Sequence, residues 1–139
     1  MFFAAHISSV LRAESLPDAL GQHWQLDFAE CQVALLLLED ASSLQEILRN
    51  TLDKADMHIE GQTFHQSSPQ QVAGALMLAH GHLNIQTWLS PKLVSVNLYL
   101  SADLVDYHTK GEQLCQLLVT LFAPKRYNCQ SSPRRFSLP

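Results

Sequence analysis

The sequence predicts a single α+β domain, a two-layer sandwich with two helices on one face of a largely antiparallel sheet. The chain has 139 residues, 47% of them hydrophobic, which is enough for one modest core and too little length for two ordinary domains. Segments 42–54 and 107–122 place apolar residues at helical spacing. The other apolar segments alternate as strands do, and the order strand, helix, strands, helix favours helices packed on one sheet face.

The first elements are a strand and a helix. Trp24, Leu26 and Phe28 alternate with polar residues, which predicts a strand. An amphipathic helix is expected at 42–54, with two candidate capping residues at its start and one apolar stripe along it: Ser42 and Ser43, then Leu44, Ile47, Leu48 and Leu52.

The rest of the domain is predicted as four strands and a second helix. The alternating segments are expected at about 56–65, 71–79, 82–89 and 94–101. The second amphipathic helix should run from about Tyr107 to Phe122, and its predicted buried stripe consists of Leu114, Leu117, Leu118 and Leu121.

The two ends of the chain have a different character from the middle. Residues 1–20 carry mixed signals, and the segment 129–139 is rich in Ser, Pro and Arg. We therefore predict an N-terminal extension at 1–20, a folded domain at 21–128 and a flexible C-terminal tail at 129–139.

Charge and cysteine content narrow the classes of function. A net charge of -4 gives no general attraction to nucleic acid or to an anionic membrane surface, so neither is an expected partner. The longest apolar run, at 33–38, is too short to span a bilayer, and the first residues lack the pattern of a secretion signal. The cysteines, Cys31, Cys115 and Cys129, form no CxxC pair. These features predict a reduced, cytoplasmic protein.

The last two predicted strands form a hairpin whose register follows from its apolar face. Keeping one face apolar pairs Leu89 with Val94 and Gln86 with Asn97, and a one-residue slip would bury polar groups. This register sets Ser101 opposite His82, close to Gly81, and we predict that Gly81, His82, Gln86 and Ser101 share one face of the hairpin. The other face is polar and could bind a ligand, pack against a second protomer or be solvated. It carries His82, Asn84, Gln86, Trp88, Ser95, Asn97, Tyr99 and Ser101.

General motifs for metal or nucleophilic chemistry are weak. His65, His80 and His82 are possible zinc ligands, but no acidic or cysteine ligand stands at a supporting spacing. The chain has no GxSxG elbow and no glycine-rich phosphate loop. We therefore predict no metal site.

Three stretches together resemble a known family. They are "GQHWQLDFAEC" at 21–31, "TFHQSSPQQVAGALMLA" at 63–79 and "HGHLNIQTWLS" at 80–90. The chain is similar to the short prokaryotic S-adenosylmethionine decarboxylase, the pyruvoyl-dependent enzyme of spermidine synthesis. The resemblance covers most of the chain beyond residue 20 and implies that family's two-layer fold.

The central departure from the family is Gly81. The family signature is Glu-Ser-His-Leu-Thr-Ile-His-Thr-Trp-Pro-Glu, and Gly81 stands at its serine. In the family that serine attacks the preceding carbonyl, and the chain is cut to leave a pyruvoyl group that acts as electron sink in decarboxylation. Glycine has neither the oxygen nor the β-carbon for these steps. The resemblance therefore implies an uncleaved chain without the pyruvoyl cofactor.

Other departures fall at the same implied site. The family histidine that assists processing matches Gln86, whose amide does not exchange protons near neutral pH. The catalytic cysteine matches Ser101, a far weaker acid. The remaining replacements are His80 for the glutamate before the serine, Ser90 for the glutamate expected to hold the ribose, and Ser67 for a stacking aromatic residue. This many changes at one site indicate natural loss of the reaction.

The resemblance implies a non-catalytic family member. Because short family members dimerise, we expect a homodimer or a heterodimer with an active paralogue whose activity it alters. The alternative is a binding module for a nucleoside, S-adenosylmethionine-like molecule or polyamine; a decarboxylase working by another route is a third possibility. The candidate ligand-binding residues are His65, His82, Trp88, Asn97 and Tyr99.

Overall fold

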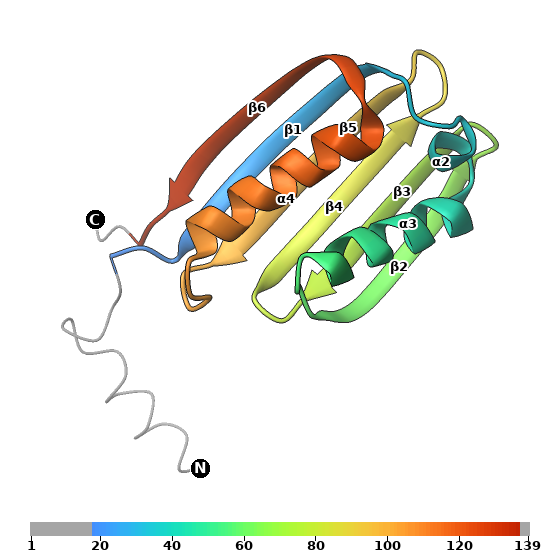
Figure 1. Ribbon diagram of the computed structural model, residues 1–139. Coiled ribbons are helices and arrows are strands. Elements are labelled where there is room, and N and C mark those ends of the chain that lie inside the picture. Colours follow the sequence, from blue (N-terminus) through green and yellow to red (C-terminus); the bar gives the residue numbers. More distant parts are fainter. Residues whose placement is uncertain (1–17, 137–139) are drawn as a thin grey trace.

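The structure is a computed structural model that describes residues 18–136 (Figure 1). These residues form one six-stranded antiparallel sheet with helices on one side. The strand order is β2-β3-β4-β5-β1-β6. In chain order the elements are β1 (Gly21–Cys31), α2 (Leu36–Glu39), α3 (Ala41–Lys54), β2 (Ile59–Ser68), β3 (Gln71–Leu78), β4 (Gly81–Trp88), β5 (Leu93–Ser101), α4 (Tyr107–Phe122) and β6 (Pro124–Arg134).

The helices form a single layer over the sheet. Helix α3 packs on β2 and β3, and α4 packs on β1 and β5, with the short α2 beside α3 (Figure 1). The opposite side of the sheet is covered by none of the described elements, and we call it the open face. This arrangement confirms the predicted α+β two-layer sandwich. Within residues 18–136, no helix is long and apolar enough to cross a membrane.

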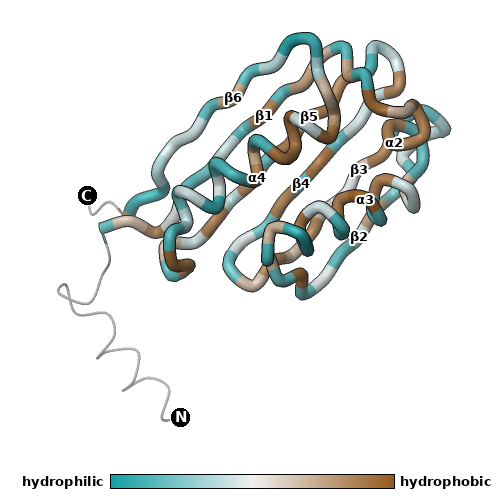
Figure 2. The backbone as a smooth tube through the Cα atoms, in the orientation of Figure 1, coloured by the Kyte–Doolittle hydropathy of each residue, from teal (hydrophilic) through white to brown (hydrophobic). Residues whose placement is uncertain are grey.

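The core lies between the helices and the covered face of the sheet. Strands β4 and β5 alternate strictly, so every second side chain points into the core and the others toward the open face. Figure 2 shows the hydrophobic residues of the strands under the helices. The largest fully buried side chain is Trp24 of β1, whose indole Nε1 donates a hydrogen bond to Glu112 Oε1 at 3.1 Å. Gly111 of α4 makes room for this ring, because a Cβ there would lie 2.0 Å from Trp24 Cη2.

The start of α3 differs from the prediction. Its N-cap is Asp40, whose carboxylate accepts hydrogen bonds from the Ser43 amide at 2.9 Å and the Ser43 hydroxyl at 2.7 Å. These bonds hold the pKa of Asp40 below its ordinary value. The serines predicted as caps, Ser42 and Ser43, therefore lie inside the first turn. The buried stripe is as predicted for three of its residues, Leu44, Leu48 and Leu52.

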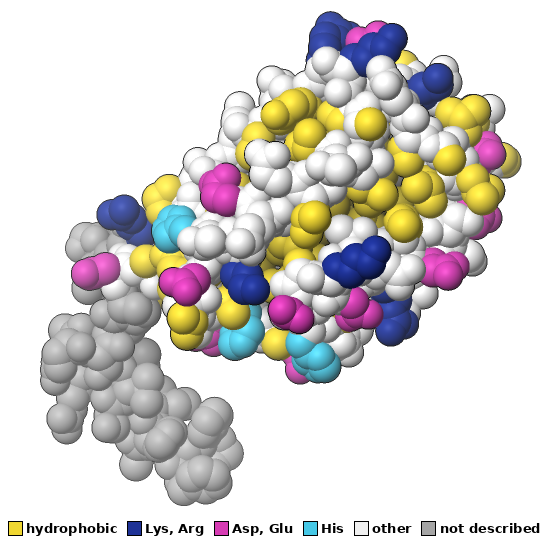
Figure 3. Space-filling model, viewed as in Figure 1, with side chains coloured by type: hydrophobic (Ala, Val, Ile, Leu, Met, Phe, Trp, Pro, Cys, Tyr) yellow, Lys and Arg dark blue, Asp and Glu magenta, His cyan; other side chains and the backbone are white. Residues whose placement is uncertain are grey.

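The buried stripe of α4 is rotated from the predicted one. Leu114 and Leu118 are buried, together with Cys115 and Phe122, whereas Leu117 is 38% exposed. Leu117 lies beside the end of α3, where Figure 3 shows hydrophobic side chains between the two helices. Tertiary packing selects the stripe that contacts β1 and β5, and a helix with leucines on adjacent positions offers more than one stripe.

The predicted C-terminal tail is partly a strand. Residues 129–134 belong to β6, which pairs along its whole length with β1, for example Cys129 with Leu26 and Arg134 with Gly21. The prediction of a flexible segment at 129–139 is therefore wrong for 129–134. An edge strand exposed to solvent needs no apolar alternation, so its sequence carries little signal. Of the predicted extension at 1–20, residues 1–17 lie outside the described residues.

The hairpin register is shifted by two residues from the predicted one. Gln86 pairs with Ser95 and His82 with Tyr99, so Ser101 does not lie opposite His82. The connection spans Leu89–Lys92 and is closed by a hydrogen bond from the Lys92 amide to the Leu89 carbonyl at 2.9 Å. A slip of two residues leaves every side chain on its original face, so alternation excludes a slip of one and permits a slip of two.

Candidate functional site

The middle of the open face carries a shallow depression of about 390 Å³. Its floor is Ala73 and Ala75 of β3, whose small side chains leave space between the longer ones of the neighbouring strands. Gln86 is paired with Ala73, and Asn84 with Ala75. The rim is completed by residues of β2 and β5: Thr63, His65, Ser95 and Asn97.

The depression offers neutral hydrogen-bonding groups. Amides, hydroxyls and one imidazole line it, and no carboxylate of the described residues is among them. One carboxylate adjoins the lining: Asp27 of β1 accepts a hydrogen bond from Ser95 Oγ at 3.1 Å. Such a surface can bind a neutral polar group or the polar face of another protein, and the lining residues themselves carry no carboxylate to attract a polyamine.

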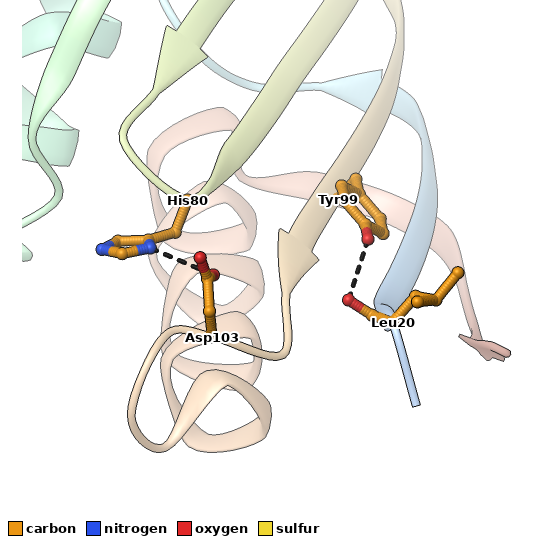
Figure 4. A network of polar contacts seen from close by, with 4 residues as sticks. All are labelled: Leu20, His80, Tyr99 and Asp103. Atoms are coloured by element: carbon orange, nitrogen blue, oxygen red, sulfur yellow. Dashed lines mark hydrogen bonds and ion pairs between the residues drawn. The ribbon is translucent and has the colours of Figure 1, made fainter. Parts of the chain in front are cut away.

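A second cluster lies toward one end of the open face, around Tyr99. Its ring centroid is 4.8 Å from that of His23 and 5.5 Å from that of His82. The Tyr99 hydroxyl donates a hydrogen bond to the Leu20 carbonyl at 3.0 Å, which fixes the ring (Figure 4). The Arg134 guanidinium lies 5.8 Å from the ring centroid of Tyr99 and 2.9 Å from His23 Nε2.

This cluster keeps His23 neutral. Burial, then the charge of Arg134 and then His82 lower the pKa of His23 from its ordinary value of 6.5. The contact with Arg134 also requires an unprotonated Nε2, because the guanidinium only donates. The cluster therefore presents the aromatic ring of Tyr99 and the cation of Arg134. The neutral imidazole of His23 on β1 contacts both.

We expect stability to fall when the solution is acidified below pH 6.5, because of His23. Between the ordinary pKa and the lower pKa in the folded state, the unfolded chain binds more protons, so lower pH favours unfolding. NMR titration of the His23 Cε1 proton and denaturant unfolding at several pH values measure this. Arg134→Gln should raise the pKa of His23 and weaken the pH dependence. A His23 that titrates at or above its ordinary value would contradict the assignment.

Gly81 stands at the beginning of β4, between Leu78 and Leu100 of the neighbouring strands. A Cβ at this position would lie 1.9 Å from the backbone carbonyl oxygen of Tyr99, so no side chain fits without movement of the backbone. Gly81 alternates with His82 and so belongs to the covered side of the sheet. The prediction that it shares the polar face of His82 and Gln86 is therefore wrong.

A polar network adjoins Gly81. The Ser101 amide donates a hydrogen bond to the His80 carbonyl at 2.7 Å, and His80 Nδ1 lies 3.1 Å from Asp103 Oδ1 (Figure 4). Hydrogen bonds from Ser101 and then His80 lower the pKa of Asp103. The network joins the turn before β4 to the loop after β5. It engages Ser101 in a structural contact beside Gly81.

The histidines considered as metal ligands lie apart. His65 pairs with Ala73 and His82 pairs with Met77, four residues further along β3, which is roughly 13 Å along a strand. His80 lies in the turn and contacts Asp103. Among residues 18–136 no group of three potential ligands comes together.

The predicted ligand-binding residues divide between the two clusters. His65 and Asn97 line the depression, whereas His82 and Tyr99 belong to the aromatic cluster. Trp88 ends β4, between Gln71 and Leu93, and lines neither.

Two residues of the aromatic cluster are missing from the predicted site. His23 could have been found from its place on the polar side of the first strand, where it alternates with Trp24. Arg134 could not, because its contact with His23 depends on the pairing of β6 with β1.

The fold defines a class of protein: a two-layer α+β sandwich with helices on one side of the sheet and a polar, open face on the other. The sequence model of the S-adenosylmethionine decarboxylase family matches residues 22–135. The chain belongs to this family, as the sequence resemblance implied.

Individual relatives agree with this assignment. The chain is 26% identical over 115 residues to an S-adenosylmethionine decarboxylase proenzyme of Prochlorococcus marinus, covering 83% of this chain and 89% of the relative. It is 29% identical to the proenzyme of Pelotomaculum thermopropionicum, covering 83% and 86%. The solved structure of the adenosylmethionine decarboxylase from Aquifex aeolicus has the same fold, with a TM-score of 0.74, 23% identity and coverage of 88% of this chain and 96% of that one.

Proposed function

We propose that the protein is a non-catalytic S-adenosylmethionine decarboxylase homologue that stays uncleaved and acts as a regulatory or partner subunit in spermidine metabolism. The observation that carries this proposal is Gly81. It has no β-carbon from which a pyruvoyl ketone could be made, and a Cβ there would lie 1.9 Å from the Tyr99 carbonyl oxygen. The strands around this position therefore pack in a way that suits glycine.

The neighbouring replacements support the same proposal. Gln86 lacks a group that titrates near neutral pH, and Ser101 takes part in the network with Asp103. Without a pyruvoyl group the chain holds no electron sink at this site, so we propose that it needs no cofactor. We also propose that the protein is cytoplasmic.

The distance between Gly81 and Gln86, two positions that match family catalytic residues, supports a role for a second chain. Gly81 and Gln86 are five residues apart on one strand, which is roughly 17 Å. They lie on opposite sides of the sheet and cannot act on one group within a single chain. A site that needs both positions would take one of them from a second chain. Independently, the open face, which none of the described elements covers, offers a surface on which a second chain could pack. This supports a homodimer or a heterodimer with an active paralogue.

The experiment is purification of the protein from its native host, followed by a decarboxylase assay. We expect a processed S-adenosylmethionine decarboxylase to co-purify, and its release of labelled carbon dioxide to change several-fold when this chain is added. Homodimers alone, with the rate of the paralogue unchanged, would remove the proposal. Labelled carbon dioxide released above the blank by this chain alone would contradict its being non-catalytic.

The depression around Ala73 and Ala75 favours a second candidate, a small-molecule binding module. Its volume of about 390 Å³ lies within the usual range for ligand sites. Calorimetry with S-adenosylmethionine, its decarboxylated product and spermidine tests this candidate. Its neutral lining favours a nucleoside group over spermidine, and no heat with any of the three compounds would count against it.

A further inference from the structure

Two cysteines on the consecutive elements α4 and β6 lie at the same edge of the fold. Cys115 lies on the sheet-facing side of α4 and is 4% exposed. Cys129 is on the edge strand β6, where its Cα partner in β1 is the fully buried Leu26. Paired residues point to the same side of a sheet, so the Cys129 side chain points to the side that α4 covers. The Cys129 thiol is close enough to Cys115 to raise the pKa of the Cys115 thiol.

The two thiols differ in access. Cys129 is exposed, whereas Cys115 is enclosed. Burial, then Cys129 and Glu112, raise the pKa of Cys115 to about 12, so it stays protonated at neutral pH. Only Cys129 is open to a reagent in solution, and Cys115 is placed to react with whatever forms on Cys129. The third cysteine, Cys31, is buried at the end of β1.

We propose that Cys115 and Cys129 form a reversible, redox-sensitive disulfide that fixes the edge strand β6 to helix α4. The bond would form under oxidising conditions and be reduced again otherwise, as the transient disulfides of reducing compartments are. This inference does not depend on the proposed function.

The oxidant in this proposal is a small-molecule disulfide. The Cys129 thiolate attacks one sulfur of the disulfide, giving a mixed disulfide and releasing one small thiol. The Cys115 thiol then loses its proton and attacks Cys129 Sγ, which releases the second small thiol. Two protein thiols lose two hydrogens in total, and the disulfide is reduced to two thiols. Because Cys115 holds its proton tightly, the second step should speed up as the pH rises.

The test is incubation of the whole protein with glutathione disulfide, followed by blocking of free thiols and tryptic digestion. Cleavage after Lys110, Lys125, Arg126 and Arg134 puts the two cysteines in separate peptides, 111–125 and 127–134. We expect these peptides to be linked and to separate on reduction. The oxidised protein should melt roughly 5 °C or more higher than the reduced one, because the bond closes a loop.

Matched serine variants distinguish this pair from chance oxidation. Cys129→Ser, on an exposed strand, should abolish both the linked peptides and the difference in melting temperature, whereas Cys31→Ser should retain both. The proposal would be overturned if oxidation gave only glutathione adducts, only dimers linked through Cys129, or a bond that includes Cys31. It would also be overturned if the Cys115–Cys129 bond formed only after the protein was denatured.

Discussion

We expect the purified protein to be one species of 15.6 kDa under denaturing conditions, with no shorter fragments. Cleavage before residue 81 requires a side-chain oxygen at that residue, and Gly81 has none. Intact-mass spectrometry of protein from its own host checks this. Two fragments meeting at residues 80 and 81 would refute the loss of processing.

The variant Gly81→Ser restores a hydroxyl at residue 81 but not the space that a side chain needs there. The added Cβ would start 1.9 Å from the Tyr99 carbonyl oxygen, so strands β4 and β5 must move apart. We expect the variant to remain uncleaved and to lose about 1–3 kcal/mol of stability, as overpacked sites do. Denaturant unfolding and intact mass measure the two effects.

Gln86→His is the control for this variant, because the Gln86 side chain is exposed on the open face and its replacement should leave stability nearly unchanged. Gly81→Ser combined with Gln86→His restores two groups of the family signature but not the space at residue 81. Efficient cleavage of the double variant would show that the backbone yields readily and that only side-chain chemistry has been lost.

We expect Asn97→Lys to convert a dimer into monomers and to raise its dissociation constant at least ~100-fold. Asn97 lies near the centre of the open face, exposed and paired with Asn84 and Gln25. In a symmetric face-to-face dimer the two new ammonium groups would approach each other away from water, which costs several kcal/mol. Sedimentation velocity at a series of concentrations measures the change.

Asn50→Lys is the matched control for Asn97→Lys. It makes the same chemical change at an exposed position of α3, on the opposite side of the molecule. It should leave the dimer intact, and both variants should keep the wild-type circular dichroism spectrum. A dimer that survives Asn97→Lys but not Asn50→Lys would place the interface on the helix layer.

The sequence was sufficient for the elements whose signal is local. Helix α4 runs from Tyr107 to Phe122 as its apolar spacing predicted, and the alternation in β4 and β5 identified both faces of the hairpin. The sequence was insufficient where the arrangement depends on contacts between segments. The hairpin register was wrong by two residues because such a slip keeps each side chain on its face. Strand β6 was missed because its exposed residues do not alternate.

The absence of a side-chain oxygen and a β-carbon at residue 81 follows from the sequence alone, because it is a property of glycine in any fold. The same is true of the amide at Gln86. Only the tertiary structure decided that Arg134 contacts His23 and that Cys129 lies near Cys115. These relations depend on strand pairing and helix packing between distant segments, which the spacing of residues along the chain does not encode.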